Sequence, residues 1–156
     1  MTHFIHGCTI CTNAVIQRTC PDIYLITTES FEDLLAIGRY HRPSLYDPYQ
    51  QKPRPLVKRR FTIGVPERVS SIGEELAHLN RKKAQDISKK VGEASVRSVC
   101  VAFQKSYANP KHEEEMREIL IRDNPNLFVS LSSTTPKIRE LKVFAETYAE
   151  AGREVP

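Results

Sequence analysis

The chain of 156 residues is poor in several residue types: it has six glycines, two methionines and no tryptophan. No apolar run approaches the roughly 20 residues that a membrane-spanning helix needs, so no membrane association is expected. Segment 1–15 lacks a basic stretch followed by an apolar one, which argues against a secretory signal. The sequence therefore predicts a cytoplasmic protein of a size that suits one domain.

The sequence also lacks the common patterns of nucleotide and nucleophile sites. It contains no G-x-x-x-x-G-K-[ST], no G-x-G-x-x-G and no G-x-S-x-G. Its five histidines are scattered, and none has a partner at metal-ligand spacing. Short patterns alone therefore indicate no complete active site.

Four cysteines are present, and two of them, Cys8 and Cys11, have C-x-x-C spacing with His6 just upstream. A structural zinc site normally takes four ligands, often as two spaced pairs, and the sequence offers no second pair. We therefore expect neither bound zinc nor a disulfide between Cys8 and Cys11. Cys100 lies in an apolar run and is expected to be a buried small hydrophobe.

The net charge is +4, from 23 basic and 19 acidic side chains, and the signs mostly alternate along the predicted helices. The one dense basic run, 52–60, is interrupted by Pro53 and Pro55 and has no interleaved aromatic residues for base stacking. A nucleic-acid-binding module is thus an alternative, and nucleic acid is not an expected partner.

Predicted strands and helices alternate along the chain. Apolar and β-branched runs predict strands over 23–28, 96–103 and 127–131. Capping boxes at 30–33 and 71–74 predict helices over about 31–37 and 74–91, the second ending at Gly92. Asn109 and Pro110 begin a third helix over about 111–123. Helices are also predicted over 12–18 and from about 135, and segment 39–66 is a proline-rich loop packed by tyrosines. This order predicts an α/β fold with a mixed or mainly parallel sheet and flanking helices.

Several peptides, in the same order along the chain, resemble those of the hydantoinase/5-oxoprolinase family. HGCTICTNAVIQR at 6–18 resembles HGTTxATNAxxER, and LITT at 25–28 with FEDLLAIGR at 31–39 resembles VTTxGFxDxLxIGRQ. RPSLYD at 42–47 and VPERV at 65–69 match RPxLYD and VxERV. VAFQKSYANP at 101–110 is similar to AVCLLFSYANP, and VSLSS at 129–133 with PKIRE at 136–140 to VSLSSEVxPEIRE. The likeness covers roughly residues 5–140 and is nearest to the hydantoinase branch.

The resemblance implies a partial actin-like ATPase, or ribonuclease H-like, domain in which residues 1–156 form a single incomplete N-terminal domain. Intact members use ATP and Mg²⁺ to open cyclic amides such as hydantoin or 5-oxoproline, and related members carboxylate ketones. The family's first phosphate turn, DxGGTxTD, has no counterpart in this chain, nor has the second one. Some matched positions also depart from the family pattern: Cys8 stands where it has Thr, Tyr40 where it has Gln, Thr134 where it has Glu and Leu141 where it has Tyr.

Two groups of residues follow from the resemblance as candidate site residues. His6, Thr9, Thr12 and Asn13 would lie at the nucleotide cleft, although Thr12 or Asn13 could equally be a helix cap. Arg39 and Arg42 would bind substrate, although either could instead anchor the long loop through a salt bridge. The peptide 106–110 is expected to be structural, with Asn109 as a helix cap, and no metal ligands are assigned.

The expected function is that of a fragment or subunit of an ATP-dependent hydrolase that opens cyclic amides and is inactive alone. No cofactor is expected on this chain by itself. The expected partner is a complementary hydantoinase subunit or fragment, or a second copy of the chain. The alternative is a non-catalytic pseudoenzyme or interaction protein that keeps the shell of the domain without its chemistry.

Overall fold

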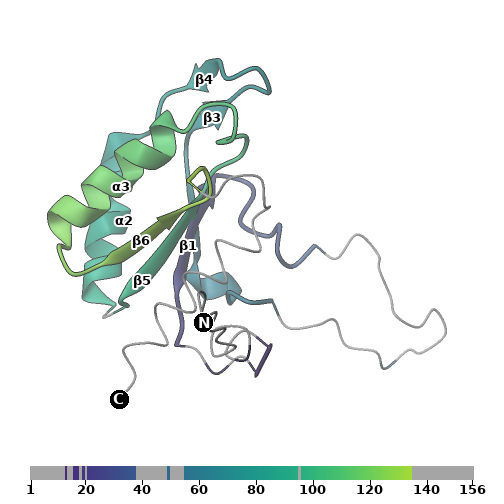
Figure 1. Ribbon diagram of the computed structural model, residues 1–156, viewed down its shortest axis with the longest axis vertical. Coiled ribbons are helices and arrows are strands. Elements are labelled where there is room, and N and C mark those ends of the chain that lie inside the picture. Colours follow the sequence, from purple (N-terminus) through teal and green to yellow (C-terminus); the bar gives the residue numbers. More distant parts are fainter. Residues whose placement is uncertain are drawn as a thin grey trace, which may run out of the picture.

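A computed structural model describes residues 21–37, 55–94 and 96–134, together with residues 13, 16, 17, 19 and 49. Its elements in chain order (Figure 1) are β1 (Tyr24–Thr28), η1 (Arg59–Phe61), β2 (Thr62–Val65), β3 (Arg68–Val69), β4 (Glu75–Ala77), α2 (Arg81–Glu93), β5 (Ser98–Ala102), α3 (Lys111–Asp123) and β6 (Phe128–Leu131). The three predicted strands and the helix over 111–123 are confirmed, with ends shifted by at most two residues.

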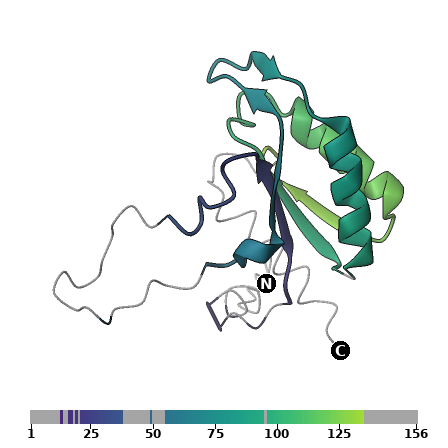
Figure 2. The ribbon, with the colours of Figure 1, turned by 180° about the vertical axis from the view of Figure 1, so that it is seen from behind.

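Four of the strands form one parallel sheet in the order β2-β1-β5-β6. The central pair is in register with Tyr24 opposite Val99, and Leu25 pairs with Thr62 on the other side of β1. Val99 in turn lies opposite Val129 of β6. Because all four strands run the same way, their carboxyl ends meet at one edge of the sheet, beside the small β3–β4 hairpin (Figures 1 and 2).

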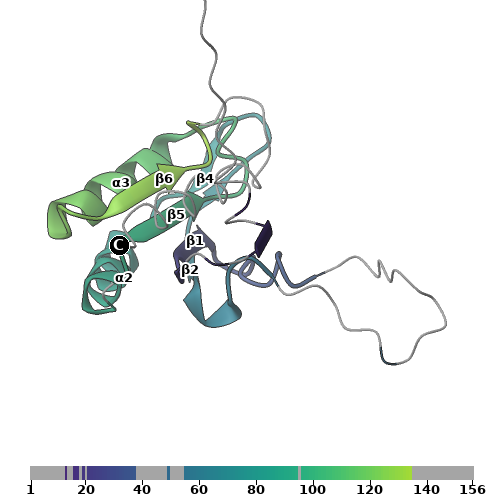
Figure 3. The ribbon, with the colours of Figure 1, turned by 60° about the horizontal axis from the view of Figure 1, so that its bottom comes forward.

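Both helices cover the same face of the sheet (Figure 3). Every second residue of β1 and β5 points at them, and α2 and α3 supply apolar side chains in return, as the 3.6-residue periodicity of their sequences requires. The buried members of this main core are Tyr24, Ile26, Val65, Leu79, Ala84, Ile87, Val91, Val99, Val101, Phe103, Met116, Ile119, Leu120 and Leu131.

The opposite face of the sheet carries a smaller core. Leu25 of β1 and Cys100 of β5 are buried there with Ile23 and Val57. Leu35, from the segment that follows β1, packs against this cluster. The burial of Cys100 confirms the prediction from its apolar run.

The prediction of a helix over 74–91 is wrong in its first turns. Ser70 Oγ accepts the backbone N–H of Glu74 at 3.0 Å, and Gly73 has a φ of 87°. These two features make a tight turn between β3 and β4, where Gly is favoured because it has no Cβ. The helix begins only at Arg81, where Asn80 Oδ1 accepts the N–H of Lys83 at 3.1 Å.

Three further expectations are corrected. Residues 32–36 form successive turns instead of a helix, with hydrogen bonds from Leu34 N to Phe31 O and from Ala36 N to Asp33 O. The proline-rich segment contains strand β2, which its short apolar run around Gly64 did not predict. Gly92 does not end α2 but lies inside it, one residue before the last.

Other predictions fall outside the described residues. They are the expectation that Cys8 and Cys11 bind no zinc and form no disulfide, the helix from about 135, and most of the helix over 12–18. Asn13, Ile16 and Gln17 have helical backbone conformation and are exposed. Within the described ranges, neither α2 nor α3 has the length and apolar character needed to cross a membrane.

Candidate functional site

The connections that follow β1 and its neighbour β5 lie on opposite faces of the sheet. After β1 the chain passes over the face that carries the smaller core, and after β5 it leads to α3 on the helix-covered face (Figure 3). A crevice opens outside the carboxyl ends of two parallel strands at such a reversal, and open α/β sheets bind ligands there. This crevice is the candidate site.

A tight turn after β1 forms one wall of the crevice. Glu29 N donates to Val65 O at 2.9 Å and Phe31 N to Thr28 O at 3.1 Å. Ser30 has a φ of 72°, which is uncommon for a residue with a side chain. Gly64 of β2 permits the close approach of this turn, because a Cβ there would come within 2.9 Å of the Glu29 Cα.

The turn after β5 forms the facing wall. Gln104 N donates to Thr28 Oγ1 at 2.9 Å, which ties the two strand ends together. The next residue, Lys105, has a φ of 64°, and Ala108 N donates back to Lys105 O at 2.9 Å. Left-handed backbone is uncommon at a residue other than glycine, and strained residues of this kind cluster at functional sites. Both walls of this crevice contain such a residue.

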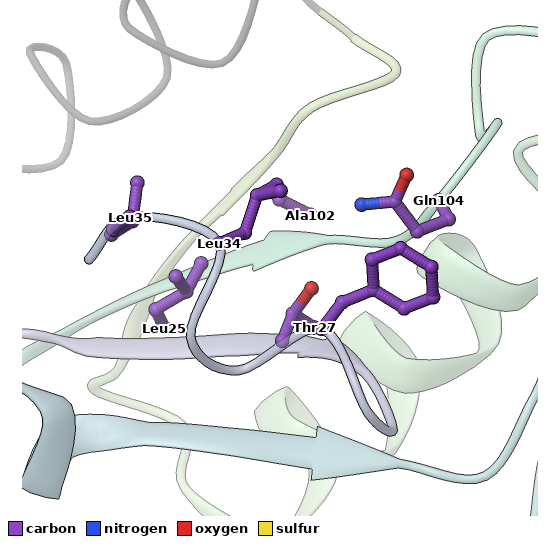
Figure 4. A pocket seen from close by; sticks show the side chains of 7 residues that line it. Leu25, Thr27, Leu34, Leu35, Ala102 and Gln104 are labelled. Carbon is purple, nitrogen blue, oxygen red and sulfur yellow. The ribbon is translucent and has the colours of Figure 1, made fainter. Parts of the chain in front are cut away.

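A hollow lies between the two walls (Figure 4). Its lining residues are Leu25, Thr27, Phe31, Leu34, Leu35, Ala102 and Gln104. Most of this lining is apolar, and Thr27 and Gln104 are its only side chains that can form hydrogen bonds. Arg68 places its guanidinium carbon 5.0 Å from the centre of the Phe31 ring, which supports that ring from outside the lining.

Below the crevice lies a buried hydrogen-bonded chain of polar side chains. Thr28 Oγ1 donates to Glu67 Oε1, and Glu67 Oε2 lies 2.8 Å from Nδ1 of His112. The other ring nitrogen of His112, Nε2, lies 2.5 Å from Glu75 Oε1. The ring of His112 therefore bridges the side chains of Glu67 and Glu75.

The side chain of Glu75, in β4, contacts three basic side chains, and two of them, Lys111 and His112, lie at the start of α3. Besides His112, its carboxylate contacts His78 Nδ1 at 3.0 Å and Lys111 Nζ at 2.9 Å. Hydrogen bonds from His78, Lys111 and His112 lower the pKa of Glu75 from 4.5 to about 2. The carboxylate is therefore charged at every physiological pH.

Glu113 performs a similar anchoring role on the other side of the helix. Its Oε1 accepts from Phe103 N at 2.9 Å and from Ser132 Oγ at 2.5 Å, and its Oε2 accepts from Ser133 N at 2.8 Å. The first turn of α3 is thus fixed to the carboxyl ends of β5 and β6. A buried carboxylate with three donors near a helix N-terminus stabilises the fold, and Glu113 is not among the residues that line the hollow.

The predicted site residues are distributed as follows. His6, Thr9, Thr12, Arg39 and Arg42 lie outside the described residues, so the structure does not place them against the crevice. Asn13 is described as an exposed helical residue. Asn109 is structural, as expected, but the N-cap of α3 is Pro110 and not Asn109. Asn109 Oδ1 accepts from Lys111 N at 3.2 Å, and its Nδ2 donates to Gly73 O at 3.0 Å.

Thr27 and Gln104 were not predicted as site residues. Each lies at or just beyond the carboxyl end of a predicted parallel strand, where polar residues face a crevice, and this position is the signal that could have identified them. The described part of the basic run is engaged in ion pairs: Lys58 with Asp22 at 2.9 Å, Arg59 with Asp33, and Arg60 with Asp22 at 3.6 Å. Within the described ranges, no cluster of three or more His, Cys, Asp or Glu side chains could hold a metal ion.

The structure is an α/β domain with a largely apolar hollow at the carboxyl ends of parallel strands. The model of one family, the hydantoinase/oxoprolinase N-terminal region, matches residues 1–123. The chain therefore belongs to the hydantoinase/oxoprolinase family.

Relatives and solved structures agree with this assignment. An uncharacterised protein of Methanocaldococcus jannaschii is 36% identical, over 94% of this chain and 22% of its own length. Caprolactamase subunit alpha of Pseudomonas jessenii is 29% identical, over 94% of this chain and 22% of its own. The crystal structure of that ATP-dependent caprolactamase superposes with a TM-score of 0.78, at 28% identity, over 93% of this chain and 21% of its own.

The nucleotide-free structure of acetone carboxylase is also similar. It superposes with a TM-score of 0.80 and 26% identity, over 93% of this chain and 23% of that chain. The chain thus spans only about a fifth of the length of these relatives.

Proposed function

We propose that this chain is part of an ATP-dependent enzyme that opens a cyclic amide of the hydantoin or 5-oxoproline type, and that its crevice forms one side of the substrate site. The observation that carries this proposal is the apolar hollow at the carboxyl ends of β1 and β5, with two hydrogen-bonding side chains in its lining. The names of the similar caprolactamase and of the family support a cyclic amide as substrate.

The described residues suit binding better than bond breaking. Glu67 and Glu113 are buried and hydrogen-bonded, and Glu75 is held by His78, Lys111 and His112, so none of the three faces the hollow as a free acid or base. ATP, when bound, would activate the poorly electrophilic amide carbonyl by phosphorylating its oxygen. The described residues do not fit a Mg²⁺ site, and no step through the nucleotide is assigned to them.

We expect the chain to be inactive alone and to act with a complementary subunit or fragment, in the cytoplasm. The similar caprolactamase is itself named by subunit, which supports such an assembly. A non-catalytic interaction protein is the second candidate, and the full engagement of the buried carboxylates by neighbouring side chains favours it.

A complementation assay tests the proposal. The alpha subunit of the Pseudomonas jessenii caprolactamase would be expressed without the segment that matches this chain, together with its partner subunit. Addition of this chain should restore ATP-dependent ring opening, measured as phosphate release and amino-acid product, whereas the chain alone should release no phosphate. The control is the relative's own excised segment. Restoration by that segment and none by this chain would reject the enzyme role and favour the interaction protein.

A further inference from the structure

One buried contact holds the first turn of α3 to the floor of the crevice. The imidazole of His112 is 2% exposed and the carboxyl group of Glu67 is fully buried, and Nδ1 of the ring lies 2.8 Å from Oε2. The other oxygen of Glu67 accepts from the Thr28 hydroxyl, which in turn accepts from Gln104 N at 2.9 Å. The contact therefore reaches the ends of both strands, β1 and β5, between which the hollow lies.

This contact depends on one proton. The second ring nitrogen of His112, Nε2, lies 2.5 Å from Oε1 of Glu75, and Glu75 is ionised at physiological pH, so Nε2 donates there. Nδ1 is the ring nitrogen left for Glu67. A hydrogen bond between Nδ1 and the Glu67 carboxyl group needs a proton, carried by either of the two groups. Without it, a lone pair of the ring would face a carboxylate.

The other charged or titratable side chains on the surrounding elements have partners of their own. They are Arg68, Glu75, His78, Arg81, Lys111, Glu113 and Glu115. Both His78 and Lys111 contact Glu75, and Arg81 forms an ion pair with Glu115.

The remaining two of these side chains are turned elsewhere. Glu113 accepts from Phe103 N at 2.9 Å, and Arg68 has its guanidinium carbon 5.0 Å from the centre of the Phe31 ring. Within the described ranges, none of these contacts reaches Glu67, so none replaces the proton that Glu67 shares with His112.

We propose that the contact between Glu67 and His112 is a proton-dependent latch, which holds α3 to the crevice floor while the two groups share a proton and opens when that proton leaves. The sign follows from a count of protons. In the open form the two groups are apart, and a separate histidine loses its proton above about pH 6.5. Opening above that pH therefore releases one proton, so the equilibrium constant for opening rises by up to about tenfold per pH unit.

The latch acts on the walls of the crevice. When it opens, the Thr28 hydroxyl loses its acceptor on Glu67 and is no longer held in place to accept from Gln104 N. The turn after β5 thereby loses its tie to the end of β1. A rise in pH thus loosens the crevice, whichever molecule the crevice binds, and the proposal does not rest on the enzyme role proposed above.

Hydrogen exchange of the Gln104 amide in the full chain measures the opening, because this N–H donates to Thr28. Exchange is followed by NMR from about pH 6 to about pH 9, and each rate is divided by the rate of an unprotected amide at the same pH. The resulting opening constant should rise by up to about tenfold per pH unit above about pH 6.5. An opening constant that does not change over this range would overturn the proposal.

Glu67→Gln is the matched variant that removes the need for a shared proton. Its carboxamide nitrogen can donate to Nδ1 of His112 while its oxygen accepts from Thr28, so the contact persists at every pH in the range. The opening constant of this variant should not vary with pH. The control is Glu118→Gln, which removes the same charge from an exposed position of α3 and should keep the pH dependence of the unmodified chain. Equal pH dependence in Glu67→Gln and in the unmodified chain would place the titration elsewhere and reject the latch.

A second measurement on the unmodified chain needs no variant to fold. In the ring ¹⁵N spectrum at neutral pH, Nε2 of His112 should have the chemical shift of a protonated nitrogen. Its Nδ1 should have the shift of a nitrogen that is protonated or accepts a strong hydrogen bond. The shift of a bare, unprotonated nitrogen at Nδ1 would show that no proton is shared with Glu67, and the proposal would be wrong.

Discussion

Nδ1 of His112 lies 2.8 Å from Oε2 of Glu67, and neither side chain is more than 2% exposed. This contact joins the first turn of α3 to the short connection between β2 and β3. Glu67 in turn accepts from Thr28 at the end of β1, so the contact also fixes the floor of the crevice. Together with the hydrogen bonds of Glu113, it links the first turn of α3 to the strand ends that form the site.

Replacement of His112 by phenylalanine should destabilise the chain by about 3–5 kcal/mol, because it leaves the buried Glu67 side chain without the ring nitrogen that it contacts at 2.8 Å. The measurement is the free energy of unfolding from urea titration. The matched control is Arg81→Gln, which removes the exposed ion pair with Glu115 and should cost less than about 1 kcal/mol. A loss below 1 kcal/mol for His112→Phe would show that the buried contact contributes little.

The lowered pKa of Glu75 makes part of the free energy of unfolding depend on pH in the acidic range. Because the pKa falls from 4.5 to about 2 on folding, the charged carboxylate stabilises the folded state. That contribution is complete above pH 4.5 and is lost as the pH falls towards 2. Glu75→Gln should therefore lower stability at pH 5 to 6, and its difference from the unmodified chain should shrink steadily below pH 4.5.

Urea unfolding at a series of pH values measures that difference. The control is Glu118→Gln, which removes a carboxylate from an exposed position of α3 and keeps the same change in net charge. A difference between Glu75→Gln and the unmodified chain that stays constant from pH 6 to 2 would contradict the role assigned to Glu75.

The left-handed conformation of Lys105 gives a prediction about the wall of the crevice. A residue with a Cβ pays about 1–2 kcal/mol for a φ near 64°, whereas glycine adopts it freely. Lys105→Gly should thus be neutral or stabilise the chain by up to about 1 kcal/mol, after the greater chain entropy of glycine is subtracted. Lys105→Val should destabilise it by more than 1 kcal/mol, because a β-branched side chain suits this conformation least. Equal unfolding midpoints for the two variants would contradict this account.

The sequence predicted the sheet better than the connections between its strands. The strands containing Ile26, Val101 and Leu131 are short buried apolar runs, and such runs have few alternatives in a small α/β domain. The helix predicted from the capping box at 71–74 does not begin there. Ser70, one residue earlier, accepts the hydrogen bond from Glu74 N, and Gly73 has a positive φ. A local pattern cannot show which of two nearby hydroxyls takes a backbone donor.

The candidate site could not be predicted from local sequence patterns either. Thr27 and Gln104 are separated by 77 positions in the chain and converge only because β1 and β5 are neighbours in the sheet. Sequence periodicity predicts strands but not their order, so it could not bring these two side chains together. The resemblance to the family placed the expected cleft in segments that lie outside the described residues.

The packing of α2 against α3 offers a last test, at Gly92 and Asn124. A Cβ on Gly92 would lie 2.4 Å from Oδ1 of Asn124. Asn124 uses its Nδ2 to donate to Ser88 O at 3.1 Å and to Ser88 Oγ at 3.2 Å, which joins the end of α3 to α2. Alanine at position 92 would therefore displace the side chain that makes these bonds.

Gly92→Ala should lower stability by about 1 kcal/mol. Alanine is favoured over glycine inside a helix by a similar amount, but the loss of the Asn124 hydrogen bonds and the steric clash outweigh that gain. In an Asn124→Ala background the obstacle is gone, so the same substitution should raise stability by about 1 kcal/mol. A double-mutant cycle from urea unfolding measures this change of sign. If Gly92→Ala has the same effect in both backgrounds, the two residues are not coupled, and the glycine is not required for the approach of the two helices.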